Sequence, residues 1–344
     1  MQVAEGRATP HGLSLSVDRR MSSTSVVDFQ PGIGWPSRVR VGLFRARSRL
    51  RARRISARQL HANLWAYGFL LPIMALLIGF KFVPMLRAIQ ISFTSYDLLS
   101  PPKFVGLNNY VILATDPRFQ QSVGITLYYM FGTAIPLWVL SLAAAMAFNQ
   151  RFPGRGWLRV GFFLPSIMPY VVFGTVWAFL FHPYGLINVG LESLGFPAVA
   201  WLSNTSAVIP GFILATDWRA IPYYMIIFLA GLQNIPAELH EAAAIDGANA
   251  PQRFWYITLP MLKPTIVLVM VVSLIFLSRS FTAAYVMTGG GPDGASTVVG
   301  LYIYQAAFSQ FRMGIASAAS VLLLLGTLLL TLLQLRLSRG GRVV

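Results

Sequence analysis

The chain has 344 residues, of which 56% are hydrophobic and only 11% are charged, against roughly 25% charged residues in an ordinary soluble domain. This balance excludes a soluble globular class and predicts a membrane protein. The absence of cysteine excludes disulfides, thiolate metal sites and cysteine nucleophiles. The net charge of +16 does not indicate a nucleic-acid-binding surface, because twelve of the 27 basic residues lie within the first 58 positions.

Residues 1–60 form an arginine-rich segment that is broken by prolines and glycines and lacks sustained helical periodicity. We predict a cytoplasmic, disordered tail that fixes the topology of the following residues, in preference to a lipid-binding or nucleic-acid-binding arm. A cleaved signal peptide is not expected, because the first apolar run is longer than a signal core. Met21 is an alternative start of translation, which the sequence alone leaves open.

Six apolar runs within residues 61–344 reach the length of about 20 residues that a helix needs to cross a bilayer core. They cover residues 64–93, 123–148, 158–181, 208–230, 265–287 and 315–335. Each run is mostly apolar and does not alternate with polar residues, which argues against the strands of an outer-membrane barrel. The expected fold is an all-α integral membrane protein with six transmembrane helices.

The distribution of lysine and arginine between the runs predicts their orientation. The basic side holds the N-terminal segment, Arg151, Arg155, Arg159, Arg253, Lys263, Arg336, Arg339 and Arg342. The opposite side holds only Lys103, Arg118 and Arg312. Because positively charged connections stay in the cytoplasm, both termini and the connection between the fourth and fifth runs are expected there.

That connection contains EAAAIDGANAPQRFWYITLP at residues 241–260. Pro236 suits the first position of a helix over 236–246, with acidic residues in the early turns and small residues on one face. Gly247 permits a turn, and a second short helix is expected over 251–260, ended by Pro260. Such a pair either docks on a cytoplasmic protein or only connects two spans, and these features alone do not decide between the two.

The pattern of Glu-Ala-Ala at 241–243, Gly247, Ile257 and Leu-Pro at 259–260 resembles the EAA loop of the membrane subunits of bacterial ABC importers. The resemblance implies that the loop over 236–260 docks as a coupling helix in a groove of a cytoplasmic ATPase and carries its closure to the membrane helices. The implied ATPase-coupling residues are Glu241, Ala242, Ala243, Asp246, Gly247, Ile257, Leu259 and Pro260.

Shorter segments extend the resemblance along most of the chain beyond the tail, namely FVGLNNY at 104–110, FLPSIMP at 163–169, YGLIN at 184–188, FLAGLQNIP at 228–236 and MTGGGP at 287–292. They are similar to the carbohydrate-uptake branch, in particular to its maltose-type or glycerol-phosphate-type first permease. The resemblance implies a type I ABC importer-like fold in the bacterial cytoplasmic membrane. Its implied partners are a second homologous permease, an ABC ATPase dimer, an extracytoplasmic solute-binding (lipo)protein and a sugar-like substrate.

No phosphate-binding G-x-x-x-x-G-K-[ST] pattern occurs, and His240-Glu241 does not continue as a metalloprotease motif, because Ala244 stands where the second histidine is required. We therefore expect no cofactor, metal ion or catalytic residue on this chain. The resemblance assigns ATP and Mg²⁺ to the partner ATPase. The expected role is that of a transport subunit and not of an enzyme.

Transfer from the maltose-type pattern, counted from the EAA glutamate, predicts the substrate path, and an arginine at membrane depth is a further candidate. The predicted path residues are Thr216, Arg219, Tyr223, Ser273 and Phe276, with Ala220 and Leu277 at positions that offer no hydrogen bond. An arginine there favours an anionic or very polar solute. The alternative is that these side chains serve only in packing between helices.

Asp217 and Arg279 are further ionisable residues expected at membrane depth, and a pair between them is one possibility. The competing functions are an ion-coupled secondary transporter, with Asp217 and the arginines as a relay, and an intramembrane enzyme or scaffold. The EAA pattern favours the importer, since a secondary transporter has no use for an ATPase-docking loop. Residues 289–292 are expected to form a flexible external loop.

Overall fold

The computed structural model describes residues 57–150 and 152–339. The chain divides into two units, Met1–Ala62 and Asn63–Val344, and the fold described below is that of the second unit with the helix that leads into it. The predicted tail over 1–60 lies outside the described residues except for its last four positions.

Five helical stretches of the described part are long and apolar enough to cross a membrane, and a bent pair of helices supplies a sixth candidate. The five stretches are Trp65–Ser92, Pro117–Asn149, Val208–Gln233, Ala250–Ser278 and Met313–Ser338, and the bent pair is Arg155–Ile167 with Tyr170–Leu180. The predicted all-α fold with six candidate spans is confirmed. Two of the runs nevertheless differ in shape from the prediction.

The first half of the unit runs from α1 to α8. The first span is built from α1 (Ala57–Leu77), the π-helical turn η1 (Ile78–Phe82) and α2 (Val83–Ser92). An antiparallel hairpin of β1 (Thr94–Ser95) and β2 (Lys103–Phe104) and the short helix α3 (Asn108–Thr115) lead to α4 (Pro117–Asn149). Then follow α5 (Arg155–Phe163), the 3-10 turn η2 (Leu164–Ile167), α6 (Tyr170–Leu180), α7 (Leu186–Ser193) and α8 (Val208–Gln233).

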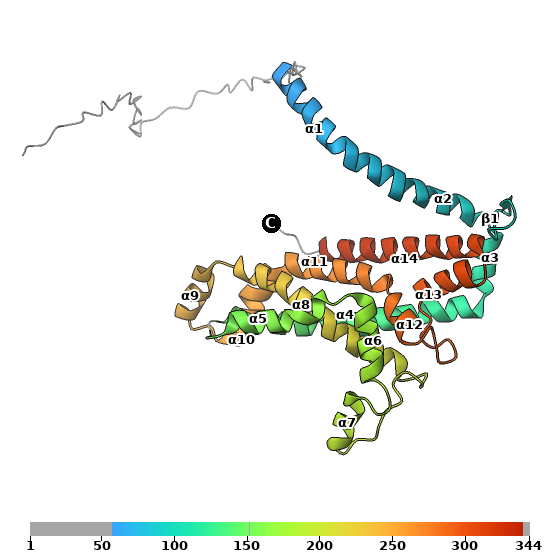
Figure 1. The fold of residues 1–344 in the computed structure, drawn as a ribbon. Helices are drawn as coiled ribbons and strands as arrows, with labels where there is room; N and C mark the ends of the chain where they lie inside the picture. Colours follow the sequence, from blue (N-terminus) through green and yellow to red (C-terminus); the bar gives the residue numbers. More distant parts are fainter. Residues whose placement is uncertain (1–56, 151, 340–344) are drawn as a thin grey trace, which may run out of the picture. The chain divides into compact units, whose positions relative to one another are not determined.

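The second half begins with the predicted coupling segment. It contains α9 (Ala237–Ile245), α10 (Ala250–Arg253), the π-helical turn η3 (Phe254–Thr258) and α11 (Leu259–Ser278). The chain then forms α12 (Thr282–Met287), α13 (Val299–Tyr304), the π-helical turn η4 (Gln305–Ser309) and α14 (Met313–Arg339). In Figure 1, α9 and α10 lie at the opposite end of the long helices from α3 and α13.

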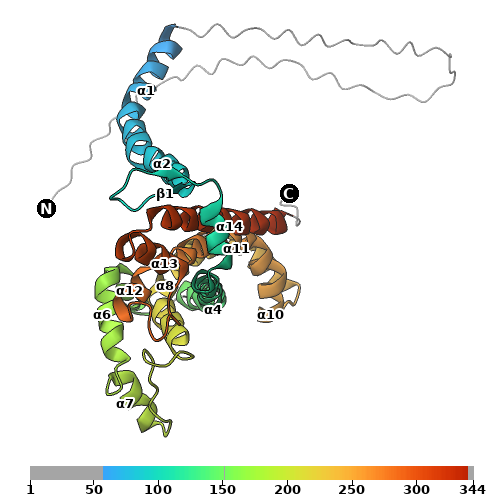
Figure 2. The same ribbon diagram turned by 90° about the vertical axis from the view of Figure 1, so that its right-hand side faces the viewer.

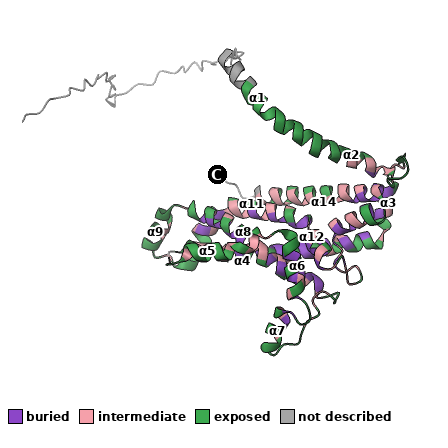
Figure 3. Cartoon of the chain, viewed as in Figure 1, coloured by how far each residue is buried: buried purple, intermediate pink, exposed green. Residues whose placement is uncertain are grey.

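The long helices α4, α8, α11 and α14 run side by side, and α4 packs most extensively against α8 (Figures 1 and 2). Gly132 allows this close approach, because a Cβ atom at that position would lie 2.6 Å from Cδ1 of Ile213. Small residues commonly permit such contacts between membrane helices. Figure 3 shows buried residues where α4, α6, α8 and α12 meet, whereas α1 is exposed along its described side chains.

The third predicted run, 158–181, is not one straight helix. Its two halves are bent by 96° at a short break, which places α5 and η2 on one side and α6 on the other. Pro169 explains the break, because proline disfavours helical backbone at the preceding residue and donates no hydrogen bond. Met168 accordingly has an extended backbone (φ −64°, ψ 133°). The break leaves backbone carbonyls within the membrane region that need partners from elsewhere.

The fifth predicted run also differs, at both ends. A continuous helical stretch covers Ala250–Ser278, so the expectation that Pro260 ends a separate short helix is wrong. Pro260 lies in the first turn of α11, directly after the wider π-helical turn η3, where a missing backbone N–H is tolerated. The C-terminal end of the stretch stops at Ser278, and the apolar residues Thr282–Met287 of the run form the separate helix α12.

Two polar contacts join neighbouring elements at the end of the long helices that lies opposite α9. The side-chain amide of Asn109 donates hydrogen bonds to the carbonyls of Ser92 and Thr94, which fixes α3 to the end of the first span. The hydroxyl of Tyr302 donates to Oδ2 of Asp116 at 2.6 Å, which fixes α13 to the start of α4. Burial, together with this hydrogen bond, raises the pKa of Tyr302 above its ordinary value.

The connection between α6 and α8 is organised around one buried amide. Asn188, with 1% of its surface exposed, accepts hydrogen bonds from the backbone N–H of Val199 and from Nε1 of Trp201. Its amide nitrogen donates to the carbonyls of Val199, Pro183 and His182. One side chain therefore ties both ends of this connection to each other.

We expect Asn188→Ala to destabilise this connection by about 1–3 kcal/mol, because it leaves several buried polar groups without partners. Limited proteolysis of the solubilised protein measures the effect as earlier cleavage within residues 182–202. The matched control is Glu192→Ala, an exposed position on the same helix, which should cleave like the unsubstituted chain. Equal cleavage rates for Asn188→Ala and the control would contradict the assignment.

Candidate functional site

The predicted coupling residues 241–247 lie on α9 and in the turn that ends it. Gly247 has a left-handed backbone (φ +81°), as the prediction of a glycine turn requires. The N–H of Ala248 bonds to the carbonyl of Ala243, and the N–H of Gly247 bonds to that of Ala244, which together form a Schellman cap. This cap ends the helix sharply and leaves the side chains of Glu241, Ala242 and Asp246 exposed.

The second part of the coupling segment begins at a capping box. The Asn249 side chain accepts from the N–H of Gln252, and the Gln252 side chain accepts from the N–H of Asn249. Ile257, Leu259 and Pro260 follow in η3 and the first turn of α11. Ile257 and Leu259 are half-buried, so they contribute to the root of the segment more than to its outer surface.

Large apolar side chains stand out from this otherwise polar end of the protein. Ile245 on α9 is 86% exposed, and Trp255 and Tyr256 in η3 are 61% and 79% exposed. Large apolar side chains that are exposed on a membrane protein's polar end are candidates for contact with another protein. The geometry of α9 to η3 is therefore that of a rigid, capped projection with a contact surface of its own.

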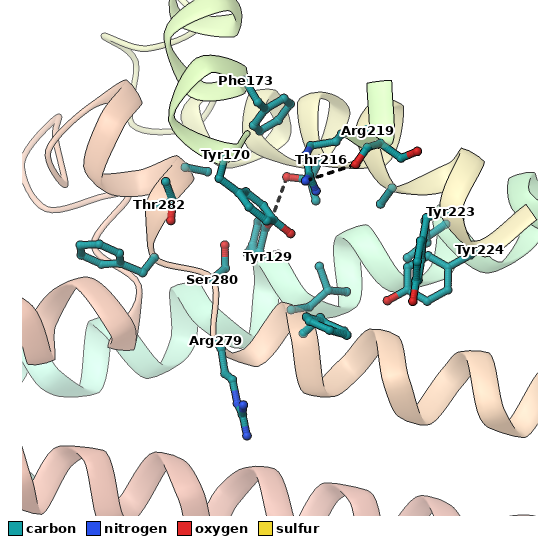
Figure 4. Close-up of a pocket in the computed structure, with 17 residues that line it drawn as sticks. Tyr129, Tyr170, Phe173, Thr216, Arg219, Tyr223, Tyr224, Arg279, Ser280 and Thr282 are labelled. Atoms are coloured by element: carbon teal, nitrogen blue, oxygen red, sulfur yellow. Dashed lines mark hydrogen bonds between the residues drawn. The ribbon is translucent and has the colours of Figure 1, made fainter. Parts of the chain in front are cut away.

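A cavity of about 420 Å³ lies between the long helices, near the break in the third span. Its walls come from α4, from both sides of the break, from α8, and from the end of α11 with the residues that lead into α12 (Figure 4). This volume is within the range of roughly 300–1,000 Å³ that is typical of small-molecule sites. The lining is largely aromatic and hydroxyl-bearing, with two arginines.

Thr216, Arg219, Tyr223 and Phe276 of the predicted path line this cavity, as do Ala220 and Leu277. Ser273 does not: it is fully buried, accepts a hydrogen bond from Nε1 of Trp138 at 2.8 Å and donates to the carbonyl of Met270. Its geometry is that of a residue that joins α11 to α4. The structure therefore brings together all predicted path residues except Ser273.

Arg219 has the most distinctive contacts in the cavity. Its Nη2 donates to the carbonyl of Met168 at 3.1 Å and to that of Ser166 at 3.5 Å, both at the break of the third span. Its guanidinium carbon lies 3.7 Å from the ring centroid of Tyr170 and 5.8 Å from that of Phe173. The cation thus supplies hydrogen bonds to the broken backbone and is stabilised by aromatic faces.

Several lining residues were not predicted from the sequence. Tyr129, whose hydroxyl lies 2.9 Å from Oγ1 of Thr216, comes from α4, and Tyr170 begins α6. Ser280 and Thr282 follow the end of α11. Two features of the sequence could have indicated these lining residues, namely the two prolines of FLPSIMP and the arginine after Ser278. Each feature marks a place where a membrane span is interrupted.

The possible pair between Asp217 and Arg279 does not form. Asp217 is 7% exposed, and its Oδ1 has no hydrogen-bond partner among the described residues. Arg279 lines the cavity, but Figure 4 shows its side chain pointing away from Tyr170 and Arg219. Asp217 and Arg219 are two residues apart on α8 and so face different directions.

The glycine-rich loop at residues 289–292, which was expected to be flexible, is contacted by several hydrogen-bonding side chains. The hydroxyl of the fully buried Ser296 donates to the carbonyl of Gly291 and pairs with Thr288 Oγ1 at 2.7 Å. Thr297 and Gln305 donate to the carbonyls of Gly290 and Gly289. These hydrogen bonds fix the conformation of the glycine-rich loop, in which Gly289 and Gly290 have positive φ angles.

With this geometry described, comparison with known proteins identifies the family. Residues 111–343 match the family described as the inner membrane component of binding-protein-dependent transport systems. The chain belongs to this family. It is 34% identical over 282 residues to the multiple sugar-binding transport system permease protein MsmF of Streptococcus mutans, covering 81% of this chain and 97% of the relative. It is also 34% identical to the trehalose/maltose permease protein MalF of Thermococcus litoralis, covering 80% and 94%.

A third relative and one solved structure extend the comparison. The chain is 34% identical to the sulfoquinovosyl glycerol permease protein SmoG of Agrobacterium fabrum, over 74% of this chain and 84% of the relative. Its fold matches that of a bacterial ABC transporter that imports the acidic polysaccharide alginate, with a TM-score of 0.73, 24% identity and coverage of 83% and 98%. The predicted ABC permease fold is confirmed.

Membership of the family decides between the predicted alternatives. The chain is an inner membrane transport subunit and not an enzyme. The ion-coupled secondary transporter and the intramembrane enzyme or scaffold are overturned by the same finding.

The contacts of Ser273 generate a prediction about this permease. Ser273→Ala removes the acceptor of the Trp138 indole N–H, and we expect a loss of about 1–3 kcal/mol in the free energy of unfolding. Thermal unfolding in detergent measures this loss. The control is Ser320→Ala, whose hydroxyl bonds to Ala316 of its own helix and to no other described residue, and which should change the stability by less than about 0.5 kcal/mol. Equal midpoints for the two variants would contradict the role of Ser273.

Proposed function

We propose that this chain is a permease subunit of an ATP-driven importer and forms half of the path for a sugar or sugar-like solute. The observation that carries the proposal is the EAA pattern on the exposed, capped helix α9 of a chain in this family. The names of the relatives MsmF, MalF and SmoG support a sugar as substrate. The cavity supports it as well, because aromatic rings and hydroxyl groups are the usual partners of sugar rings.

The coupling step assigned to this chain is mechanical. The surface that binds an ATPase subunit lies on α9 and in the turn that ends it, and consists of Glu241, Ala242, Ala243, Asp246 and Gly247. The residues Ile257, Leu259 and Pro260 join that surface to α11. Because α8 leads directly into α9, and α10 continues into α11, displacement of α9 is transmitted to two walls of the cavity.

The partners of the proposed importer follow from the cavity and the family. A second homologous permease completes the path, and an ABC ATPase dimer binds ATP and Mg²⁺. An extracytoplasmic solute-binding protein delivers the solute. Thr216, Arg219, Tyr223 and Phe276 line this chain's half of the path. The excess of basic residues on the side of α9 supports an orientation with both termini in the cytoplasm.

The proposed cycle is alternating access. Closure of the ATPase dimer moves α9, the helices α8 and α11 rock, and the cavity opens toward the binding protein; hydrolysis reverses the motion. The break in the third span supports such motion, since the hinge at Met168 and Pro169 is outside any helix. This chain contributes half of the path and the coupling segment that moves its walls.

A pull-down of the tagged full-length chain from its native membranes in mild detergent tests the assembly. We expect a P-loop ATPase, a second EAA-bearing permease and an exported binding protein among the co-purified proteins. Recovery of the chain alone, in conditions that preserve known ABC complexes, would overturn the importer assignment.

Gly247→Val tests the coupling role more directly. A β-branched residue at φ +81° adds roughly 1–3 kcal/mol of backbone strain and should unwind the end of α9. We expect a loss of at least tenfold in ATP-driven uptake, with unchanged insertion into the membrane. Uptake into reconstituted vesicles with the full complex is the measurement.

The matched control for this experiment is Gly195→Val. Gly195 also has a left-handed backbone, at φ +83°, and has open space around it, but it lies in the connection between α7 and α8. The same strain is thus placed away from the coupling segment. Uptake should stay within about twofold in this control, and equal losses in both variants would contradict a special role for Gly247.

A further inference from the structure

Among the described residues, the lining of the cavity carries positive charge and no acidic side chain. Arg219 and Arg279 are the charged residues of its lining, and no aspartate or glutamate of the described chain lies among them. Asp217 does not line the cavity. A cation at membrane depth without a counter-charge is costly, so such residues usually have a functional partner.

The guanidinium of Arg219 is held in place but is not neutralised. Nη2 is used by the carbonyls of Met168 and Ser166, and the ring of Tyr170 covers one face. Nη1 has no hydrogen-bond partner among the described residues, and Nε is buried without one. Carbonyl dipoles and an aromatic face carry only partial charges, so the unit charge of Arg219 still favours an anion.

The surroundings of Arg219 suit the uncharged part of a sugar. The hydroxyl groups of Tyr129 and Thr216 are paired with each other, and Ser280 lies near Tyr129 in Figure 4. Tyr170 and Phe173 offer ring faces. In such a site the planar guanidinium can bind a carboxylate, while the neighbouring hydroxyl groups and aromatic rings bind the sugar ring that carries it.

We propose that the solute carried by this permease is an acidic sugar, and that Arg219 binds its carboxylate in the cavity. This inference rests on the proposed function and names the substrate class of the same site. Arg279 has no such role, because its side chain points away from Arg219 and Tyr170. A role of Arg219 in holding only the break of the third span predicts no dependence on the charge of the sugar.

The test compares sugars that differ only in charge. Equilibrium binding is measured on the complete permease–ATPase complex in lipid nanodiscs, using methyl glycosides of glucuronate, galacturonate and mannuronate and the neutral methyl esters of the same compounds. We expect the unsubstituted complex to bind at least one acid tenfold or more tightly than its ester. This preference should weaken as the salt concentration rises.

Three variants locate the preference. In Arg219→Gln we expect the acid and the ester to bind within twofold of each other, and Arg219→Lys, which keeps the charge but not the planar fork, should lie between. Arg279→Gln removes an equal charge at the edge of the lining, from a side chain that points away from Arg219, and should keep at least half of the preference. Binding of the ester shows that each variant is folded, and the thermal midpoint of each complex gives a second measure.

Each further outcome has a defined meaning. Equal binding of acids and esters by the unsubstituted complex overturns the acidic-sugar inference and leaves the importer assignment intact. An unchanged preference in Arg219→Gln, or an equal loss in Arg279→Gln, overturns the assigned contact. If neither acids nor neutral sugars bind, the sugar assignment fails as well, whereas the pull-down of ATPase and binding protein tests the importer independently of any sugar.

Discussion

The break in the third span depends on one interaction, the pairing of Arg219 with backbone carbonyls. In a membrane every backbone polar group must find a partner within the protein, so a helix cannot simply stop at that depth. Pro169 forces the chain to stop there, and Nη2 of Arg219 satisfies the carbonyls of Ser166 and Met168 that the break exposes. The cavity is a consequence, because the 96° bend keeps α5 and α6 from lying along α8 as one straight helix would. The same cation therefore supports the wall of the cavity and gives it charge.

The second constraint is the continuity of the helix that leaves the coupling segment. Ala250–Ser278 contains 29 residues without interruption, which at 1.5 Å per residue is about 43 Å. Phe276 and Leu277 near its C-terminal end line the cavity, and its first turns carry the root of the predicted ATPase contact. The π-helical turn η3 allows Pro260 inside this stretch, so the chain gains a rigid lever where two separate elements were expected from the position of the proline.

Hydrophobicity predicted the number of spans because about 20 apolar residues are required wherever a helix crosses lipid. Gly247 was predictable for a similar reason, since a left-handed turn after a helix has few other solutions. The break at Met168 was not predictable, because a proline within an apolar run indicates a kink and a full interruption of the helix equally well. A full interruption requires a hydrogen-bond donor from another helix. That donor is Arg219, which lies 51 residues from Met168 in the sequence. The position of Ser273 outside the cavity lining was not predictable either, because Trp138, whose indole N–H bonds to its hydroxyl, lies on another helix. Local patterns thus locate elements, whereas the contacts between elements select the residues of the site.

The helices α8 and α11, which carry most of the predicted path, also contact each other directly between the cavity and the coupling segment. Gly231 of α8 leaves no room beside α11, because a Cβ atom there would lie 2.5 Å from Oγ1 of Thr265 and 2.8 Å from Cδ1 of Leu262. This contact lies between the coupling segment and the cavity residues of both helices. A displacement of α9 therefore reaches α8 and α11 as a pair in tight contact, while Arg219 connects α8 to the broken span by hydrogen bonds that can be exchanged. The contact between α8 and α11 at Gly231, near the proposed ATPase, is therefore stiff, whereas the hydrogen bonds of Arg219 at the proposed solute site can be exchanged. A solute that competes for Arg219 would act on these exchangeable hydrogen bonds.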